Sequence, residues 1–176
     1  FLAYGTTASV SRHLGAGDLR SALAQGVDGI WLAVLIGGLT TVLGIALTPQ
    51  LIGAFAVSAE VAGHGETYLA IAFLGTVPLL VMLATTGVLR GLQDTTTPMV
   101  VAIGGNLVNV VLNLALVFGL GPVPALGIAG AALGSVIAQT ASALILVAVV
   151  VRAARAHDAP LTPDRAGILA AAHAAV

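Results

Sequence analysis

The sequence predicts an all-α protein built as a bundle of transmembrane helices. Three observations lead to this prediction. Of the 176 residues, 59% are hydrophobic and only 7% are charged, whereas soluble domains carry about 25% charged residues. Long charge-free stretches are rich in Ala, Leu, Val and Gly, without the alternation typical of membrane β-strands. The six basic residues are all arginine and lie in only three parts of the chain.

The charge-free stretches set the number of expected spans. They cover residues 29–59, 67–89 and 95–151, and about 20 apolar residues suffice for one transmembrane helix. The third stretch is long enough for two helices, and the Gly/Pro-rich segment 119–127 divides it into a hairpin. The predicted spans cover residues 27–47, 67–88, 97–118 and 127–151.

Both ends of the chain are apolar but short. Residues 1–11 and 166–176 would each form a helix of about 16 Å, which does not cross a core of about 30 Å. We therefore expect a partial helix at each end, and we expect the chain to be a fragment of a longer protein.

The arginines predict the orientation. All six lie in loops 12–28, 89–96 and 152–165, and none lies in the alternate loops 48–66 and 119–126. Because positively charged loops stay in the cytoplasm, the first three loops are expected to be cytoplasmic. The protein is thus expected in the cell membrane, with the lipid bilayer as a partner.

Several classes of function are disfavoured. The net charge of −1 gives no basic surface for nucleic acid. The chain lacks cysteine, which excludes disulfides and thiolate metal sites. His64 and Glu66 have the spacing of a metal-ligand pair, but an exposed loop histidine is the simpler interpretation, so no metal is expected. No aspartate pair, zinc-ligand set or serine–histidine arrangement lies at membrane depth, so no enzyme and no cofactor is expected.

Three asparagines form the strongest candidate site. At 100° per residue, Asn106, Asn109 and Asn113 fall within an arc of about 60° on one helix. Polar groups inside a membrane are costly unless they are paired. The three amides are therefore expected either to line a functional cavity or to form hydrogen bonds between helices.

The next predicted helix carries a second polar stripe. Ser135, Gln139 and Ser142 are spaced at i, i+4 and i+7, so they share one helical face. The short hairpin makes this helix an antiparallel neighbour of the asparagine helix, and the two stripes are expected to face each other. Serine often bonds to its own helix, so Gln139 is the stronger candidate.

Other positions indicate packing and shape. The pairs Gly130/Gly134 and Gly87/Gly91 have the spacing of small residues at close helix contacts. Pro78 lies within the second predicted span and is expected to kink it.

The predicted spans hold no charged residue at their middle. A proton relay usually needs an ionisable group at that depth. Asp28 is the nearest, and we expect it in the first turn of its helix, where the positive helix end favours a carboxylate. Trp31 lies close by, as an interfacial anchor would.

Four segments of the chain carry short motifs that occur in a fixed order. The first is SRHLGAGD at 11–18, and the second is LRGLQDTTTP at 89–98. They are followed by NLVNVVLN at 106–113 and by FG at 118–119 with PALGIAGAA at 124–132. In their order and spacing, across most of the chain, these segments resemble the MATE (multidrug and toxic compound extrusion) family, in its DinF-like bacterial branch.

The resemblance implies a place within a twelve-helix fold of two lobes. Residues 1–151 would be a partial amino-terminal transmembrane lobe that covers the end of helix 2 and helices 3 to 6. Residues 152–165 would be the cytoplasmic loop between the lobes, and 166–176 the start of helix 7. The carboxy-terminal lobe would then lie beyond this chain.

The resemblance also implies a function. Family members are secondary antiporters that export small organic, often cationic, compounds in exchange for protons or sodium. Asn109 and Asn113 would line the cavity, with Asn106 and Gln139 as supports. The family pattern allows an acid where this chain has Asn113, and a carboxamide does not release a proton near neutral pH. Proton coupling through this position is therefore not expected.

Arg90 and Asp94 belong to the motif in loop 89–96. They are expected to form a cytoplasmic hinge or gate, or else simply to cap helix ends. Two other functions fit the same helical plan. A flippase for lipid-linked oligosaccharides or polysaccharides would need a cationic cavity, and a non-transporting membrane scaffold would bury the asparagines completely.

Overall fold

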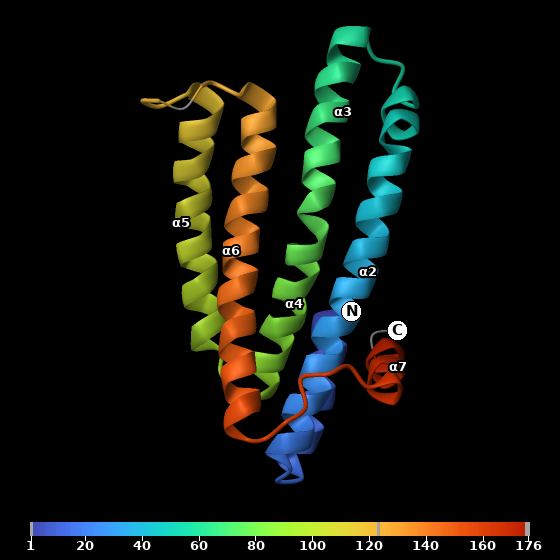
Figure 1. The fold of residues 1–176 in the computed structure, drawn as a ribbon, viewed down its shortest axis with the longest axis vertical. Helices are drawn as coiled ribbons and strands as arrows, with labels where there is room; N and C mark the ends of the chain where they lie inside the picture. The colour runs from blue at the N-terminus through green and yellow to red at the C-terminus, as the bar shows by residue number, and fades with distance from the viewer. Residues whose placement is uncertain (1, 123, 175–176) are drawn as a thin grey trace.

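The computed structural model describes residues 2–122 and 124–174, and this part of the chain is helical almost throughout (Figure 1). Seven helices follow one another within these residues. They are α1 (Leu2–Gly15), α2 (Leu19–Gly53), α3 (Ala59–Leu74), α4 (Thr76–Gly91), α5 (Thr96–Phe118), α6 (Gly127–Ala156) and α7 (Arg165–Ala174). The all-α prediction is confirmed.

The long helices run along one common axis, so their connections gather at two ends. The turns after α1, α4 and α6 lie at the bottom of Figure 1, and the α2–α3 and α5–α6 connections lie at the top. The bottom end contains the connections 16–18, 92–95 and 157–164, and the six arginines lie in the helix ends beside them. The predicted alternation of the loops is therefore confirmed, while the arginines belong to helices and not to the loops themselves. We call the bottom end the cytoplasmic end.

Four helical segments are long and apolar enough to cross a membrane. They are α2, the consecutive pair α3–α4, α5 and α6, which confirms four spans. Their apolar side chains cover the outer surface of the bundle, where Leu107, Val111 and Leu144 are largely exposed. An apolar exterior is the arrangement that a lipid environment requires.

The helix of the first predicted span extends beyond residues 27–47 at both ends, and the predicted loop 48–66 is wrong because most of it is helical. α2 begins at Leu19, because the Asp18 side chain caps it by accepting a 2.9 Å hydrogen bond from the Ser21 N–H. At its far end α2 runs through Pro49 to Gly53, so the connection covers only residues 54–58 and not 48–66. Charges mark where the apolar stretches end, but the helices continue beyond them.

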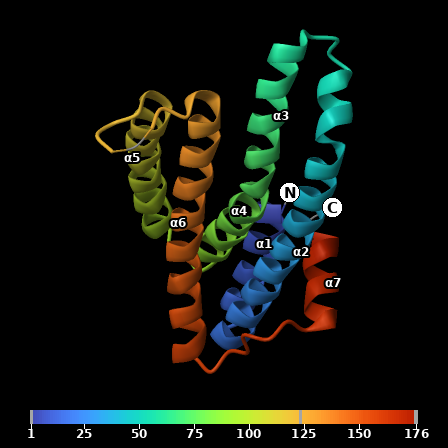
Figure 2. The ribbon, with the colours of Figure 1, turned by 45° about the horizontal axis from the view of Figure 1, so that its top comes forward.

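The second span is interrupted where its proline predicts. Gly75 separates α3 from α4, and Pro78 is the third residue of α4. Since proline has no N–H, the carbonyl of Leu74 loses its regular helical partner. The expected kink is therefore a break between two helices, which follow one another in Figure 1 and form a visible bend in Figure 2.

The packed core lies in the cytoplasmic half of the bundle, around α4. Val88 and Leu89 of α4 are buried together with Val10 of α1 and with Leu146 and Val150 of α6. α5 packs mainly on α6, and Pro98 is its single buried residue. The α5–α6 hairpin thus forms one side of the bundle, with a sparse contact between α5 and α4.

Glycines bring the helices close together, as their spacing predicts. A Cβ on Gly130 of α6 would overlap the carbonyl of Leu116 on α5. A Cβ on Gly91 of α4 would lie 2.7 Å from the Cβ of Val10 on α1. The carbonyl of Gly87 accepts a 3.0 Å hydrogen bond from the Thr7 hydroxyl, also on α1.

The last helix has a different direction from the others. Figure 1 shows α7 nearly end-on beside α2, and it lengthens in Figure 2, where the molecule is tilted. α7 packs against α1 and α2. In this structure it lies across the bundle axis and not along it.

Candidate functional site

The asparagine stripe of α5 meets the serine stripe of α6, as predicted. Asn109 Nδ2 donates a 3.2 Å hydrogen bond to the Ser135 hydroxyl, which donates in turn to the carbonyl of Ala131 at 3.1 Å. Asn113 Nδ2 donates to Asn109 Oδ1 at 3.2 Å. A directed chain of hydrogen bonds therefore runs from Asn113 through Asn109 to α6.

Asn113 is turned towards α6 and away from open space. Its Oδ1 is buried and has no hydrogen-bond partner among the described residues. This oxygen lies directly on Gly134, where a Cβ would overlap it. An unpaired buried carbonyl oxygen lowers the stability of the fold by about 1–3 kcal/mol. The close approach of Asn113 to α6 is possible because residue 134 is a glycine.

A cavity of about 210 Å³ lies between α4, α5 and α6, next to this chain of hydrogen bonds. Asn106, Asn109 and Gln139 line it, whereas Asn113 does not. Its other lining residues are Met82, Ala102, Gly105, Ala138 and Ser142. None of these described lining residues is charged, so amides provide most of the polarity.

Gln139 connects the cavity with the break in the second span. Its Oε1 would lie 2.9 Å from a Cβ placed on Gly75, so the amide packs directly against the junction of α3 and α4. Sequence reasoning did not place Gly75 or Met82 at the site. Pro78 is the signal that could have located the break beside the cavity.

A second cavity of about 460 Å³ continues towards the cytoplasmic end. It shares Met82 and Ala102 with the first, and Arg90, Thr86 and Thr95 are its polar lining residues. Arg90 is its single charged residue among those described, and it is exposed. The two cavities thus extend from the asparagines to the motif loop along the sparse α4–α5 contact.

Asp94 caps α5. Its Oδ1 accepts hydrogen bonds from the N–H groups of Thr96 at 3.1 Å and Thr97 at 2.9 Å. The hydrogen bonds from Thr97, above all, lower the pKa of the Asp94 carboxyl below its ordinary value of 3.8. The capping alternative is thus observed for Asp94, while Arg90 faces the second cavity. Whether the loop also acts as a gate stays a prediction.

Asp28 does not lie in the first turn of its helix, so that expectation is wrong. Because α2 begins at Leu19, Asp28 is in its third turn and only 6% exposed. Its Oδ1 accepts a 2.9 Å hydrogen bond from the N–H of Asp164, directly before α7. The helix end that the carboxylate meets belongs to α7 and not to α2.

The remaining titratable groups show no metal centre. His64 lies exposed on α3. Within residues 2–122 and 124–174, no three His, Asp or Glu side chains are grouped as metal ligands would be.

The fold and the site together define a class. The described residues form four membrane-length segments, and three of these segments line an uncharged, amide-bearing cavity. This is the arrangement of a polytopic helical membrane protein with a polar site inside its span. The MatE family model matches residues 1–115. The chain belongs to the MatE family and is a multi-pass protein of the cell membrane.

Curated relatives and solved structures agree with this assignment. The chain is 29% identical over 147 residues to the probable multidrug resistance protein NorM of Thermotoga maritima, covering 83% of this chain and 32% of NorM. It is 33% identical over 122 residues to the multidrug resistance protein PmpM of Pseudomonas aeruginosa, covering 69% and 26%. DNA damage-inducible protein F of Escherichia coli is 30% identical over 145 residues, covering 82% and 31%.

The fold matches family structures over nearly the whole chain. An inward-facing multidrug resistance MATE family transporter of the MOP superfamily superposes with a TM-score of 0.82 at 20% identity, covering 98% of this chain and 39% of that one. A MOP superfamily transporter from Pyrococcus furiosus gives 0.83 at 21% identity, covering 97% and 38%. The chain therefore spans about a third of the length of its curated relatives.

Proposed function

We propose that the whole protein is a secondary active antiporter that exports small organic, often cationic, compounds in exchange for protons or sodium. The observation that carries this proposal is the cavity of about 210 Å³ lined by Asn106, Asn109 and Gln139 between membrane-length helices. The names of two relatives, both multidrug resistance proteins, support efflux as the activity.

The lining suits an amphipathic substrate. Asn109 already takes part in the hydrogen bonds that join α5 to α6. Asn106 and Gln139 also line the cavity, and each amide offers both a carbonyl acceptor and N–H donors. Carbonyl oxygens attract a cationic group without requiring a carboxylate, while Met82 and the alanines provide apolar contacts.

Movement between inward- and outward-facing states would use the break at Gly75. Transporters of this type bind substrate where broken helices meet near the membrane midplane, and two bundles rock around that site. The Gln139 amide, which touches the break, would connect occupancy of the cavity with the angle between α3 and α4.

The coupling ion would be carried outside the asparagine stripe. Asn113 remains a neutral amide near pH 7, and no carboxylate is among the described residues that line the cavity. Residues beyond this chain would then provide the acid for a proton or the ligands for sodium. The carboxy-terminal lobe is the expected partner in this arrangement.

The test is drug export by the full-length protein in proteoliposomes with an imposed proton or sodium gradient. Asn109→Ala together with Gln139→Ala is expected to lower export at least about tenfold, because binding amides are removed. Thr140→Val is the matched control, since Thr140 is exposed on α6 and its hydroxyl bonds only to the carbonyl of Val136. Unchanged export in the double variant would refute the assignment of the cavity.

One observation favours a second function. Arg90 lines the cavity that continues from the amides to the cytoplasmic end, and a flippase for a lipid-linked oligosaccharide would use such a cation at the diphosphate. The same proteoliposomes distinguish the two activities. Translocation of a labelled polyprenyl-diphosphate sugar without ion-driven drug export would establish the flippase instead.

A further inference from the structure

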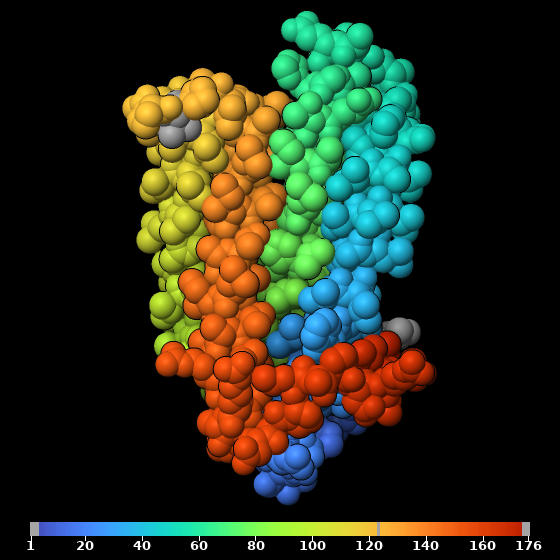
Figure 3. All heavy atoms as spheres, viewed as in Figure 1, coloured from blue at the N-terminus to red at the C-terminus, as the bar shows by residue number. Residues whose placement is uncertain are grey.

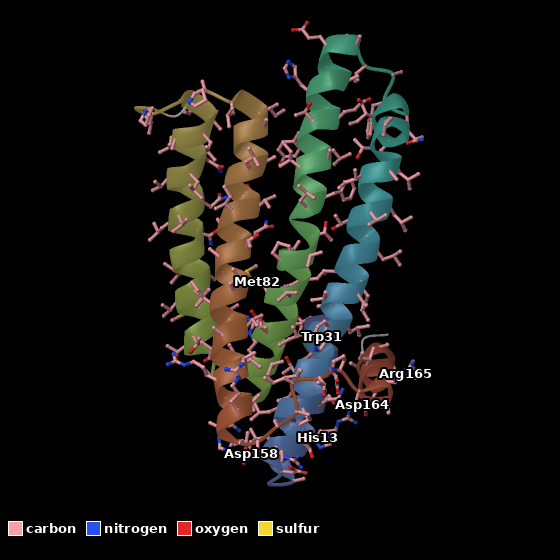
Figure 4. The ribbon with its side chains drawn as sticks, in the orientation of Figure 1. His13, Trp31, Met82, Asp158, Asp164 and Arg165 are labelled. Carbon is pink, nitrogen blue, oxygen red and sulfur yellow. The ribbon has the colours of Figure 1, made fainter. Side chains whose placement is uncertain are left out.

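One face of α2 binds the segment that leads out of this lobe. We define the strap as residues 157–164, between α6 and α7. Figure 3 shows it as an orange band that crosses over the blue helices near the cytoplasmic end. Figure 4 shows His13, Trp31 and Asp164 close to this crossing, with Asp158 at its lower edge.

Four side chains of α2 hold the strap and the first turn of α7 by their main-chain atoms. Arg20 Nε donates to the carbonyl of Asp158 at 2.9 Å, and Trp31 Nε1 donates to the carbonyl of Leu161 at 3.1 Å. Gln25 Nε2 donates to the carbonyl of Gly167 at 3.1 Å. The fourth contact is the hydrogen bond from the Asp164 N–H to Asp28.

Apolar packing fixes the same segment. Ala159 is buried against Leu23 and Val27 of α2, and Leu161 packs beside them. The turn that ends α6 directs the chain towards this face of α2. Asp158 has a φ of +52°, and the Ala159 N–H bonds back to the carbonyl of Ala154 at 2.9 Å, which is the geometry of a closed helix C-terminus.

Asp28 is the central contact. The residue is 6% exposed, and its Oδ1 accepts the N–H of Asp164, directly before the first residue of α7. The side chain also lies against Gly167, at which any Cβ would overlap the carboxylate. α7 is therefore positioned on α2 by a hydrogen-bond acceptor on one side and by a missing side chain on the other.

We propose that α2 latches the strap, so that α7 moves with this lobe as one rigid body and the strap is not the hinge between the lobes. The proposal rests on the two-lobe transporter described above. A slack connection would let α7 follow the other lobe when the two bundles rock. With the latch closed, a movement of α2 would instead move α7 together with it.

Distances between spin labels on the full-length protein test the latch. Cysteines at Leu35→Cys on α2 and Leu169→Cys on α7 carry the labels, because both side chains are largely exposed. The distance is expected to be narrow and identical with and without substrate and ion. A wild-type distance that changes between these states would overturn the proposal.

Variants of Asp28 test the cause of the rigidity. Asp28→Ala is expected to broaden the distance distribution and to raise hydrogen exchange at the Asp164 amide roughly tenfold, since a charge-assisted hydrogen bond is lost. Asp28→Asn keeps an oxygen acceptor and is expected to keep the narrow distance. A narrow distribution in Asp28→Ala would contradict the latch.

A second label pair and a second variant separate a released strap from an unfolded lobe. Labels at Val111→Cys and Leu144→Cys, both exposed on the α5–α6 hairpin, are expected to keep their distance in every variant. If Asp28→Ala alters the α5–α6 distance, Gly167→Ala replaces it as the test of the latch, because it disturbs the same contact from α7. Gly167→Ala is expected to broaden the α2–α7 distance and to leave the α5–α6 distance unchanged. Because these readouts need no transport, they hold or fail independently of the proposed export activity.

Discussion

Asn113 donates from Nδ2 to Oδ1 of Asn109, 3.2 Å away and one turn nearer the cytoplasmic end of α5. This bond lies between two neighbours on the same helix, whereas the bond across to α6 leaves from Asn109. The two asparagines therefore contribute unequally to the packing of the hairpin.

The inequality gives a prediction about stability. Asn109→Ala removes two hydrogen bonds, each worth about 0.6 kcal/mol in a membrane protein. It is expected to lower the free energy of unfolding by about 1 kcal/mol. Asn113→Ala removes one bond but also an unpaired buried oxygen, so its cost is expected to be smaller. Reversible unfolding in bicelles measures both, and an equal or larger loss in Asn113→Ala would contradict the hydrogen-bond pattern.

Close helix contact predicts a contrast between two glycines of the α5–α6 hairpin. Gly130→Ala forces a Cβ into the Leu116 carbonyl and is expected to cost about 1–3 kcal/mol through overpacking. Gly104→Ala is the matched control, because nothing lies within 4 Å of its Cβ position. That substitution is expected to be neutral or slightly stabilising, since alanine is the better helix former. Similar thermal midpoints for the two variants would show that the hairpin is looser than described.

The cap of α5 predicts a dependence on pH. The pKa of Asp94 is lowered in the folded protein, so its stabilising contribution is present above the ordinary value of 3.8 and is lost as the pH falls through the lowered value. Asp94→Ala is expected to cost about 1 kcal/mol at pH 7. Thermal unfolding between pH 2.5 and pH 7 is expected to show a smaller acid loss in this variant than in the wild type. Parallel curves for the two proteins would contradict the assignment.

The end of α4 predicts a stabilising substitution. Gln93 has a φ of +68°, a left-handed conformation that costs a residue with a Cβ about 1–2 kcal/mol. Gln93→Gly is expected to raise the free energy of unfolding by up to about 1 kcal/mol, and Gln93→Ala is expected to leave it unchanged. A thermal melt of the three proteins compares them, and equal effects of Gly and Ala would exclude backbone strain as the cause.

The sequence predicted the coarse architecture because a membrane makes strong demands on composition. Arginine placement assigned the loops to two ends, and Pro78 located the break of the second span to within three residues. Helix ends were predicted less well, since α2 extends beyond both limits of its predicted span, residues 27–47. Its start depends on the Asp18 cap, a local hydrogen bond that hydropathy does not detect.

The candidate site was predicted in part. Helical periodicity placed Asn106, Asn109 and Asn113 on one face, and the hairpin brought Ser135 opposite them. Periodicity did not show that Asn113 turns away from the cavity, because that orientation follows from the contact with Gly134. The hydrogen-bond partner of Asp28 could not be predicted either, because Asp164 is brought next to Asp28 only by the path of the strap.

The way in which α2 holds the strap has a consequence for how this segment changes during evolution. Arg20, Gln25, Asp28 and Trp31 bind only main-chain atoms of residues 158–167. Every residue type presents the same carbonyl and almost every type the same N–H. We therefore expect related proteins to vary in the exposed side chains of the strap, while retaining apolar residues at the positions of Ala159 and Leu161. A glycine at the position of Gly167 and an acceptor at that of Asp28 are expected to be retained as well.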